Sequence, residues 1–456
     1  VITLSLIFSG LYEALYGLLQ LYDMKSSFHA SFKVTGTFFN PAPYSGYLLA
    51  VFPFALQKVI FAPQKNLMSV LKINHRFYQR RKGKKDGDHH NGNLPSLKSW
   101  LKGIYIYFLT FLNIKTGQWA VYAISLLTVL LIIVVLPATL SRASWLGIIA
   151  ASAFLAWQIP AFQRRKTRLF TRYPKWIIYV ILTCLLTAGL TGIYFLKKDS
   201  ASGRLLIWKI TLAESLEKPV TGHGFNAFMA KYPPAQARYF SEGNGTQYEG
   251  FVAGNVGHVF NEPLQIFFEQ GLIGLLLFLL ILGWAMRIKK PEKGETGIFH
   301  SAKASILGIF VFSLFSYPFY SVPICVVFAV SLGILSGFEK PLRFANTPAV
   351  KYFIIAVVLL IAMHIVSVLP RLKKSYWLWD EANALYTMNS YKEANKSFQE
   401  AYSLYLDHNG IFLLNYAKSL YLSEDYNKAL EMLTEGKQYY TDEVYFTTLG
   451  DTYKAL

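Results

Sequence analysis

Long apolar blocks separated by short polar segments dominate the chain, without the two-residue alternation that is typical of a half-buried strand. A helix needs about 20 mostly apolar residues to cross the hydrocarbon core of a bilayer. Blocks that approach this length cover residues 1–21, 44–60, 119–137, 144–159, 175–196, 264–286, 303–316, 321–335 and 350–369. The pattern therefore predicts an all-α protein built on a polytopic bundle of transmembrane helices.

The basic loops between these blocks predict the orientation of the bundle. Residues 65–99, expected to form a disordered or surface-lying loop, and residues 163–175 carry clusters of Lys and Arg, and such clusters favour the cytoplasm. An even number of crossings must separate the two loops, so the short apolar run 100–114 is expected to be interfacial or re-entrant. The same count places the polar loop 197–258, and the chain after Pro370, in the periplasm.

The composition supports a membrane protein and excludes a soluble globule, with 53% hydrophobic and 16% charged residues. The net charge of +19 does not indicate nucleic-acid binding, because the basic residues form short clusters such as 164–168 and 287–290 beside apolar blocks. Cys184 and Cys325 lie far apart in apolar blocks, so they are predicted to be buried thiols rather than a disulfide. Because Val1 lies inside an apolar block, we expect the sequence to be part of a longer chain.

The tail after residue 375 repeats a pattern of small residues. They recur with spacings of 35 and then 33 residues, close to the period of about 34 residues of tetratricopeptide repeats. The three series are Ala382, Ala417 and Gly450; Ala394 and Ala429; and Ala401 and Gly436, with Phe398 and Leu433 as large apolar partners. We therefore predict a transmembrane domain at 1–370 and an incomplete α-helical solenoid of these repeats at 375–456, with more repeats to follow.

Three residues on the predicted periplasmic side could act together on a phosphorylated substrate at the membrane surface. Arg142 precedes one apolar block, His258 precedes another, and Arg204 ends the segment 200–204, which is predicted to be the cap and first turn of a helix. Guanidinium groups bind phosphate oxygens through paired hydrogen bonds, and a neutral histidine accepts a proton from an attacking hydroxyl. The alternatives are a membrane anchor for Arg142, a solvated loop position for Arg204, and a loop histidine without a role for His258.

Other polar residues receive structural interpretations. Gln265, Glu269 and Gln270 are expected in the first turns of a span near the headgroups, and Glu13 comes nearest to an acidic residue at mid-depth. Asn40 and the proline after it are expected to end regular structure at the membrane edge, and Tyr320 to join an interfacial aromatic belt. The sequence has neither a phosphate-binding Gly-x-x-x-x-Gly-Lys loop nor a metal-spacing Cys and His cluster, so no cofactor and no metal are predicted.

Four segments, in this order, resemble the signature segments of the O-antigen ligase and polymerase superfamily. They are TGTFFNPAPYSGYL at 35–48, LSRASWLG at 140–147, SGRLLIWK at 202–209 with KPVTGHGFNAF at 218–228, and GHVFNEPLQIFFEQGLIG at 257–274. The resemblance implies a multi-span glycosyltransferase of the GT-C type in a bacterial inner membrane. Such an enzyme needs no metal, and it transfers a saccharide from undecaprenyl diphosphate to an acceptor, usually lipid A core.

The resemblance also implies roles for individual residues. Arg142 and Arg204 match arginines associated with the donor pyrophosphate, and His258 matches a histidine that activates or orients the acceptor hydroxyl. Asn261 and Glu262 are predicted to orient His258 or to bind sugar. Many relatives carry a His-x-His-Asn segment, whose second histidine is replaced here by a phenylalanine. If that second position performed the chemistry, this chain would lack its base.

Three functions remain open from the sequence. The first is an O-antigen ligase, with a lipid-linked glycan as donor. The second is an O-antigen polymerase or a protein O-oligosaccharyltransferase, which shares the chemistry and differs in its glycan or protein acceptor. The third, of another class, is a membrane transporter or an anchor that displays the repeats to a protein partner. The third predicts that Arg204→Ala is silent, whereas both enzyme functions predict loss of transfer.

Overall fold

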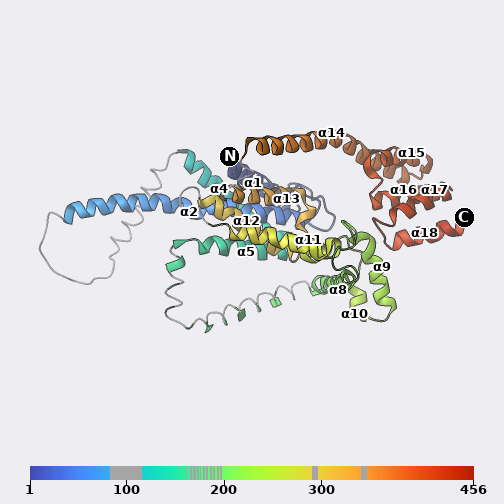
Figure 1. Cartoon of the computed structure of the whole chain (residues 1–456), viewed down its shortest axis with the longest axis horizontal. Coiled ribbons are helices and arrows are strands. Elements are labelled where there is room, and N and C mark those ends of the chain that lie inside the picture. The colour runs from blue at the N-terminus through green and yellow to red at the C-terminus, as the bar shows by residue number, and fades with distance from the viewer. Residues whose placement is uncertain are drawn as a thin grey trace. The chain divides into compact units, whose positions relative to one another are not determined.

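A computed structural model describes residues 1–82, 116–160, 198–289, 296–339 and 347–456, together with single positions between 161 and 197. In these residues all regular secondary structure is helical, without a strand. The predicted interfacial run 100–114 and most of the predicted span 175–196 lie outside the described residues. Figure 1 shows the elements along the chain.

The chain divides into two compact units, each built from two stretches of sequence. Unit 1 comprises Val1–Thr191 and Leu282–Glu339, and unit 2 comprises Gly192–Ile281 and Lys340–Leu456. The described elements of unit 1 are α1 (Ile2–Leu21), α2 (Pro41–Lys82), α4 (Thr116–Val135), η1 (Leu136–Thr139), α5 (Arg142–Trp157), α12 (Thr296–Ser313), η2 (Pro318–Tyr320) and α13 (Val322–Ser336). Those of unit 2 are α8 (Lys198–Ser215), α9 (Phe228–Ser241), α10 (Gln247–Val252), most of α11 (Glu262–Arg287), α14 (Pro348–Thr387), α15 (Tyr391–Ala401), η4 (Tyr402–Leu406), α16 (Gly410–Leu422), α17 (Tyr426–Gly436) and α18 (Glu443–Ala455).

Six helices of the described residues are long and apolar enough to cross a membrane. They cover Ile2–Leu21, Pro41–Phe61, Trp119–Thr139, Glu262–Arg287, Thr296–Ser313 and Pro348–Thr387. The shorter apolar helices Arg142–Trp157 and Val322–Ser336 coincide with the predicted blocks 144–159 and 321–335. The sequence-based prediction of helical secondary structure is thereby confirmed for the described residues, and their apolar helices fit a multi-pass membrane protein.

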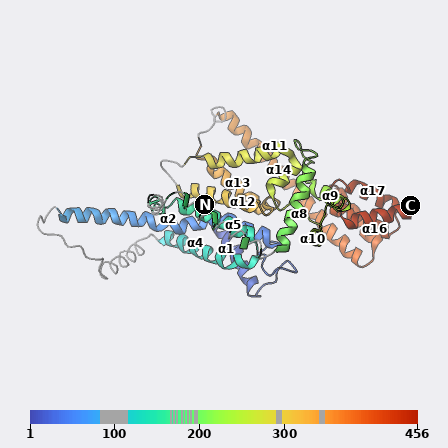
Figure 2. The same cartoon turned by 90° about the horizontal axis from the view of Figure 1, so that it is seen from below.

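Small residues allow the helices of unit 1 to approach closely. A Cβ atom on Gly46 of α2 would lie 2.7 Å from the ring of Phe312, and one on Gly147 of α5 would lie 2.8 Å from the carbonyl oxygen of Gly308. Lipid tails are as apolar as Leu, so close backbone packing of this kind is a main source of helix association in membranes. Helices α2, α5 and α12 therefore pack directly against one another, as Figure 2 shows.

Helix α11 is broken at Gly271, where a continuous span over 264–286 was predicted. Gly271 has φ +64° and ψ −164°, a conformation open to glycine and strained for other residues. The loop before α9 fills the break: the Leu272 N–H donates to the Pro219 carbonyl at 2.8 Å, and the Gly224 N–H donates to the Glu269 carbonyl at 2.9 Å. A side chain at Gly271 would place its Cβ 2.2 Å from the Val220 carbonyl oxygen, so the insertion requires glycine.

Two of the three polar residues expected near the headgroups, Gln265 and Glu269 in the first turns of α11, are buried inside unit 2, whereas Gln270 is exposed. Gln265 is 2% exposed and Glu269 is 5% exposed. The Gln265 amide donates to Glu269 Oε1 at 3.1 Å. Their cost of burial is therefore offset by hydrogen bonds within the protein.

Two helices extend beyond the predicted ends of their apolar blocks. Helix α2 continues to Lys82, through part of the predicted loop 65–99, and α14 continues through Pro370 to Thr387. A proline inside a helix removes one backbone hydrogen bond, so Pro370 alone was a reasonable terminator. Instead, α14 carries the chain without interruption into the tail.

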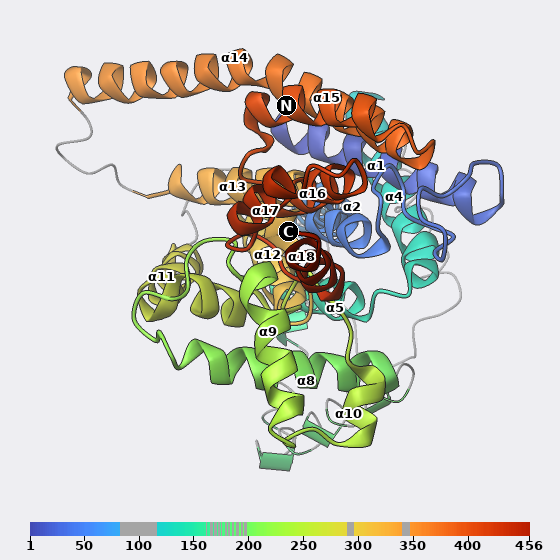
Figure 3. The ribbon, with the colours of Figure 1, turned by 90° about the vertical axis from the view of Figure 1, so that its right-hand side faces the viewer.

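The tail consists of successive helices joined by short turns (Figure 3). Six of the seven small residues of the repeat pattern are buried where consecutive helices pack. Ala382, Ala394, Ala401, Ala417 and Ala429 are each 0% exposed and Gly436 is buried, whereas Gly450 is exposed. The packing pairs include α14 with α15 and α16 with α17. This arrangement fits helix pairs of the expected period, and the assignment to tetratricopeptide repeats stays a prediction, as does the domain division into 1–370 and 375–456.

Candidate active site

Arg204 lies in the second turn of α8, one turn further into the helix than predicted. The helix begins at Lys198, and Asp199 in its first turn places a negative charge at the positive end of the helix dipole. This favourable charge stabilises the start of the helix, which begins two residues before the predicted cap and first turn at 200–204. From this position the guanidinium carbon of Arg204 lies 5.0 Å from the ring centroid of Phe260, within cation–π range.

Hydrogen bonds from both sides hold the loop that carries His258. Trp208 donates its indole N–H to the Val259 carbonyl at 2.9 Å, and the Val259 N–H donates to Gln265 Oε1 at 3.2 Å. Val259 is 0% exposed and packs in a core with Leu206 of α8. The segments 202–209 and 257–274, far apart in sequence, are therefore joined in one site. Sequence reasoning missed the bracing roles of Trp208 and Gln265, although a half-buried indole N–H normally requires an acceptor.

Phe260 connects the two predicted site residues of unit 2. Its ring packs edge-on against the His258 ring, with centroids 6.4 Å apart and planes at 89°. The guanidinium group of Arg204 lies over the face of the same ring. Its φ is +57°, an outlier for a bulky residue that is found preferentially at functional sites. The structure thus brings Arg204 and His258 to the same aromatic ring. Phe260 itself supplies no proton acceptor at the position where the family resemblance implies a second histidine.

Asn261 and Glu262 occupy the start of α11. The Leu264 N–H donates to Asn261 Oδ1 at 3.0 Å, which is the bond of a helix N-cap. Glu262 is 4% exposed and lies at the helix N-terminus, where the dipole stabilises negative charge. Both residues therefore shape the backbone directly after His258, and their predicted contact with sugar stays a prediction.

Burial changes the acid–base behaviour of His258. Desolvation lowers the pKa of its imidazole to about 4, because a partly buried site disfavours the charged form. The ring is therefore neutral at physiological pH, and one of its nitrogens can accept a proton. This is the protonation state that a general base requires.

We expect kcat/KM for transfer to show no acid limb near the ordinary histidine pKa of about 6.5. The folded-state pKa of about 4 lies below that value, so the free enzyme keeps the base form until the pH approaches 4. The unfolded chain binds this proton more readily, so the contribution of His258 to stability is lost as pH falls from about 6.5 towards 4. A pH–rate profile from about pH 5 to 8 checks this, and a limb centred near 6.5 would contradict it.

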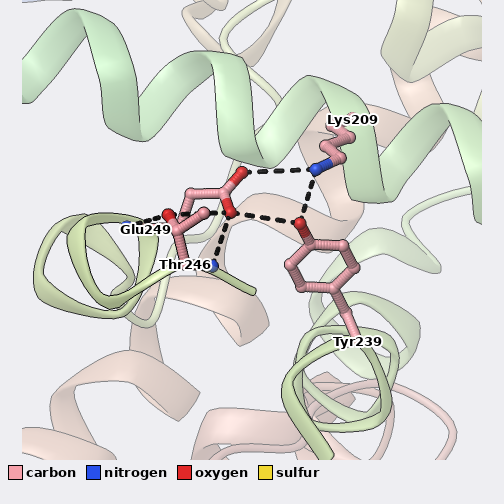
Figure 4. Close-up of polar contacts among 4 residues, drawn as sticks. All are labelled: Lys209, Tyr239, Thr246 and Glu249. Atoms are coloured by element: carbon pink, nitrogen blue, oxygen red, sulfur yellow. Dashed lines mark hydrogen bonds and ion pairs between the residues drawn. The ribbon is translucent and has the colours of Figure 1, made fainter. Parts of the chain in front are cut away.

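A polar network fixes α8, and with it Arg204, against its neighbours (Figure 4). Lys209 Nζ donates to the Tyr239 hydroxyl of α9 at 2.5 Å and pairs with Glu249 of α10 at 3.3 Å. Thr246 and Glu249 form a capping box at the start of α10. The bond to Tyr239 is the main cause that raises the pKa of Lys209, and the Thr246 backbone N–H is the main cause that lowers the pKa of Glu249. The network therefore holds α8, α9 and α10 together through charged partners.

Arg142 is the first residue of α5, in unit 1. The Ser144 hydroxyl donates to the Ser45 hydroxyl at 2.6 Å and lies 2.7 Å from the Ser141 hydroxyl, so the segments 35–48 and 140–147 also meet. A cation at a helix N-terminus opposes the helix dipole, and stabilisation of the helix does not account for Arg142. Its grouping with Arg204 and His258 stays a prediction.

The described residues contain no group of three or more His, Cys, Asp or Glu side chains that could hold a metal ion. The residues gathered around Phe260 offer one cationic group and one neutral base, a set suited to an anionic substrate that undergoes proton transfer. Metal independence of the chemistry stays a prediction.

Comparisons with known proteins support the family resemblance. Residues 127–279 match the family described as O-antigen ligase. A protein of Rickettsia bellii described as "Putative polysaccharide ligase" is 29% identical over 135 residues, which cover 29% of this chain and 31% of the relative. A protein of Rickettsia conorii with the same description is 34% identical over 89 residues, 20% of each chain. No solved structure matches the chain.

The matches span less than a third of the length of either relative. The family match includes Arg142, Arg204, His258 and the segments that carry them. Residues 127–279 are thus similar to the O-antigen ligase family, and shorter stretches are similar to two polysaccharide ligases, while the described residues include apolar helices that are compatible with a membrane protein.

Proposed function

We propose that the protein is a glycosyltransferase of the bacterial inner membrane that works at the periplasmic face. It transfers a glycan from undecaprenyl diphosphate to an acceptor such as lipid A core, as an O-antigen ligase of the GT-C type. The observation that carries the proposal is the meeting of Arg204 and His258 at the ring of Phe260. The match to the O-antigen ligase family over 127–279 supports it.

In this proposal the arginines bind the leaving group. Arg204 and Arg142 donate hydrogen bonds to the diphosphate oxygens of the donor. As the bond between the anomeric carbon and the diphosphate oxygen breaks, its electron pair goes to the diphosphate. The guanidinium groups stabilise the negative charge that develops there.

His258 acts on the other reactant. Its neutral imidazole accepts the proton of an acceptor hydroxyl while the hydroxyl oxygen forms the new bond to the anomeric carbon. The products are the glycosylated acceptor, undecaprenyl diphosphate and one proton released from the imidazolium. Asn261 and Glu262 orient His258 through the start of α11 or contact the sugar.

Contacts of the tail favour a second acceptor class. Thr441, between α17 and α18, donates its N–H to the Met229 carbonyl at 3.1 Å and its hydroxyl to the Ala230 carbonyl at 2.9 Å. Asn255, three residues before His258, donates to the Tyr440 hydroxyl at 3.2 Å. A partner protein bound to the predicted repeats would therefore be held by the element that contacts the His258 loop. This favours a protein O-oligosaccharyltransferase, or a scaffolded polymerase, as the alternative.

Transfer in a reconstituted membrane tests the proposal. The purified chain in proteoliposomes receives a labelled undecaprenyl-diphosphate glycan with lipid A core, a second lipid-linked glycan or a glycosylatable protein as acceptor. We expect label on one acceptor, with the same rate in the presence of a metal chelator. If no acceptor is labelled, while substitutions in the tail abolish the cellular phenotype, the transporter or anchor function is favoured instead.

A further inference from the structure

Unit 1 contains a cavity of about 550 Å³ that the proposed mechanism does not use. It lies between α1, residues 37–40, the start of α2 and the turn before α13. Its volume is within the range of about 300–1,000 Å³ that is typical of small-molecule sites. Part of its wall is the segment 35–48, one of the four segments that resemble the family and the one without an assigned role.

Aromatic side chains form much of the wall. They are Tyr12, Phe38, Phe39, Tyr47 and Tyr320. Phe39 is 77% exposed and Tyr12 is 60% exposed, so neither ring is required to fill the core of the unit. The faces of aromatic rings carry partial negative charge and attract the weakly positive C–H groups of a sugar ring. Tyr320 also lines this cavity, and its place in an interfacial belt stays a prediction.

A buried carboxylate lies at the wall of the cavity. Glu13 of α1 is 8% exposed, and its oxygens accept hydrogen bonds from the Thr37 N–H at 3.1 Å and the Thr37 hydroxyl at 2.6 Å. A carboxylate has about four acceptor positions, so it can accept further hydrogen bonds from ligand hydroxyls. Within the described part of the chain no ion pair is formed by Glu13. An ionisable residue inside a membrane-spanning helix is retained for function by default.

A second polar group on the wall has no hydrogen-bond partner among the described residues. The Ser321 hydroxyl is buried, with the residue 7% exposed, and no hydrogen bond to it is formed by the described residues. A buried hydroxyl is normally hydrogen-bonded. A ligand in the cavity that carries hydroxyl groups would satisfy it.

We propose that this cavity binds a pyranose ring of the glycan substrate, with Tyr12 and Phe39 against the apolar face of the ring and Glu13 and Ser321 hydrogen-bonded to its hydroxyls. A prenyl chain would cover the aromatic wall but would leave the Ser321 hydroxyl without a hydrogen bond and the remaining acceptor positions of Glu13 unfilled. The inference rests on the proposed glycosyl transfer, and the sugar can belong to the donor glycan or to the acceptor glycan.

Substrates of different length test the inference in the reconstituted full chain. One series pairs undecaprenyl-diphosphate donors of one and four sugars with a fixed acceptor, and a second series pairs a fixed donor with short and long acceptor glycans. We expect Tyr12→Ala combined with Phe39→Ala to lower kcat/KM for the long glycan about tenfold more than for the short one, in the series whose sugar occupies the cavity. Phe8→Ala is the matched control, because Phe8 is a 50% exposed residue of α1 outside the cavity wall.

Three results would overturn the inference: an unchanged preference for long glycans in both series, an equal loss for short and long glycans, or inhibition by sugar-free undecaprenyl phosphate that the double variant relieves. The last would assign the cavity to the prenyl chain.

If the wild type transfers no glycan at all, the proposed function fails. Saturation-transfer NMR with the free tetrasaccharide then tests sugar binding in the cavity separately. A signal that is lost in the double variant supports sugar binding there, and the absence of a signal with the wild type refutes it.

Discussion

Replacing His258 with alanine is expected to lower kcat for glycan transfer by a factor of about 10² to 10⁴, the range for loss of a general base. The side chain lies beside Phe260 on a loop braced by Trp208 and Gln265, so the loop retains its main anchors after the substitution. Initial rates at saturating donor and acceptor measure the effect.

His408→Ala is the control for the His258 substitution, because this histidine is exposed on the tail and pairs only with its neighbour Asp407 in the ion pairs of the described residues. His258→Gln, which keeps hydrogen-bonding capacity without a comparable base, should be nearly as slow as His258→Ala. Full activity of both His258 variants would refute its role as base. The base would then have to come from another segment of the chain.

Replacing Arg204 with alanine is expected to lower kcat/KM for the lipid-linked donor by about 10- to 100-fold. A charge-assisted hydrogen bond contributes about 1.5–3 kcal/mol, and Arg204 loses its bonds to the diphosphate. Arg204→Lys should recover part of this loss, because a lysine keeps the charge without the planar pair of donors. Inhibition by inorganic pyrophosphate should weaken in parallel, which a merely structural role of Arg204 would not cause.

Arg238→Ala is the matched control for Arg204, since Arg238 is an exposed arginine of the same unit that pairs with Glu214 and Glu217. Both variants lose one positive charge from unit 2. A silent Arg204→Ala would contradict the enzyme functions and favour the anchor. An equal loss in both variants would point to general electrostatics rather than to binding of the diphosphate.

The sequence predicted which residue types form the candidate site, but it did not predict the contacts between them. The residue types came from chemistry that is readable in one dimension: arginines and a histidine next to apolar blocks on one predicted side. The contacts could not be read this way, because Phe260 adopts a positive φ and meets Arg204 from a helix far away in sequence. The resemblance implies a histidine at the position of Phe260 and so raised doubt about catalysis, whereas in the structure the Phe260 ring contacts both Arg204 and His258.

The helices also deviate from their predicted ends because of contacts with residues outside the local sequence. An apolar run indicates that a segment is long enough to cross a bilayer, but it does not show whether the helix is continuous over that length. At Gly271 the interruption depends on carbonyl and N–H groups of residues 219–224. At Pro370 the helix continues despite a local signal to stop.

By itself, then, the sequence determined the all-helical class, the apolar spans and the chemical identities of the candidate site residues, because bilayer thickness and side-chain chemistry act on each segment alone. Tertiary structure decided which of these segments meet, where α11 breaks, and that His258 is sufficiently buried to stay neutral. Those features depend on hydrogen bonds and desolvation contributed by residues distant in the chain, which no local pattern encodes.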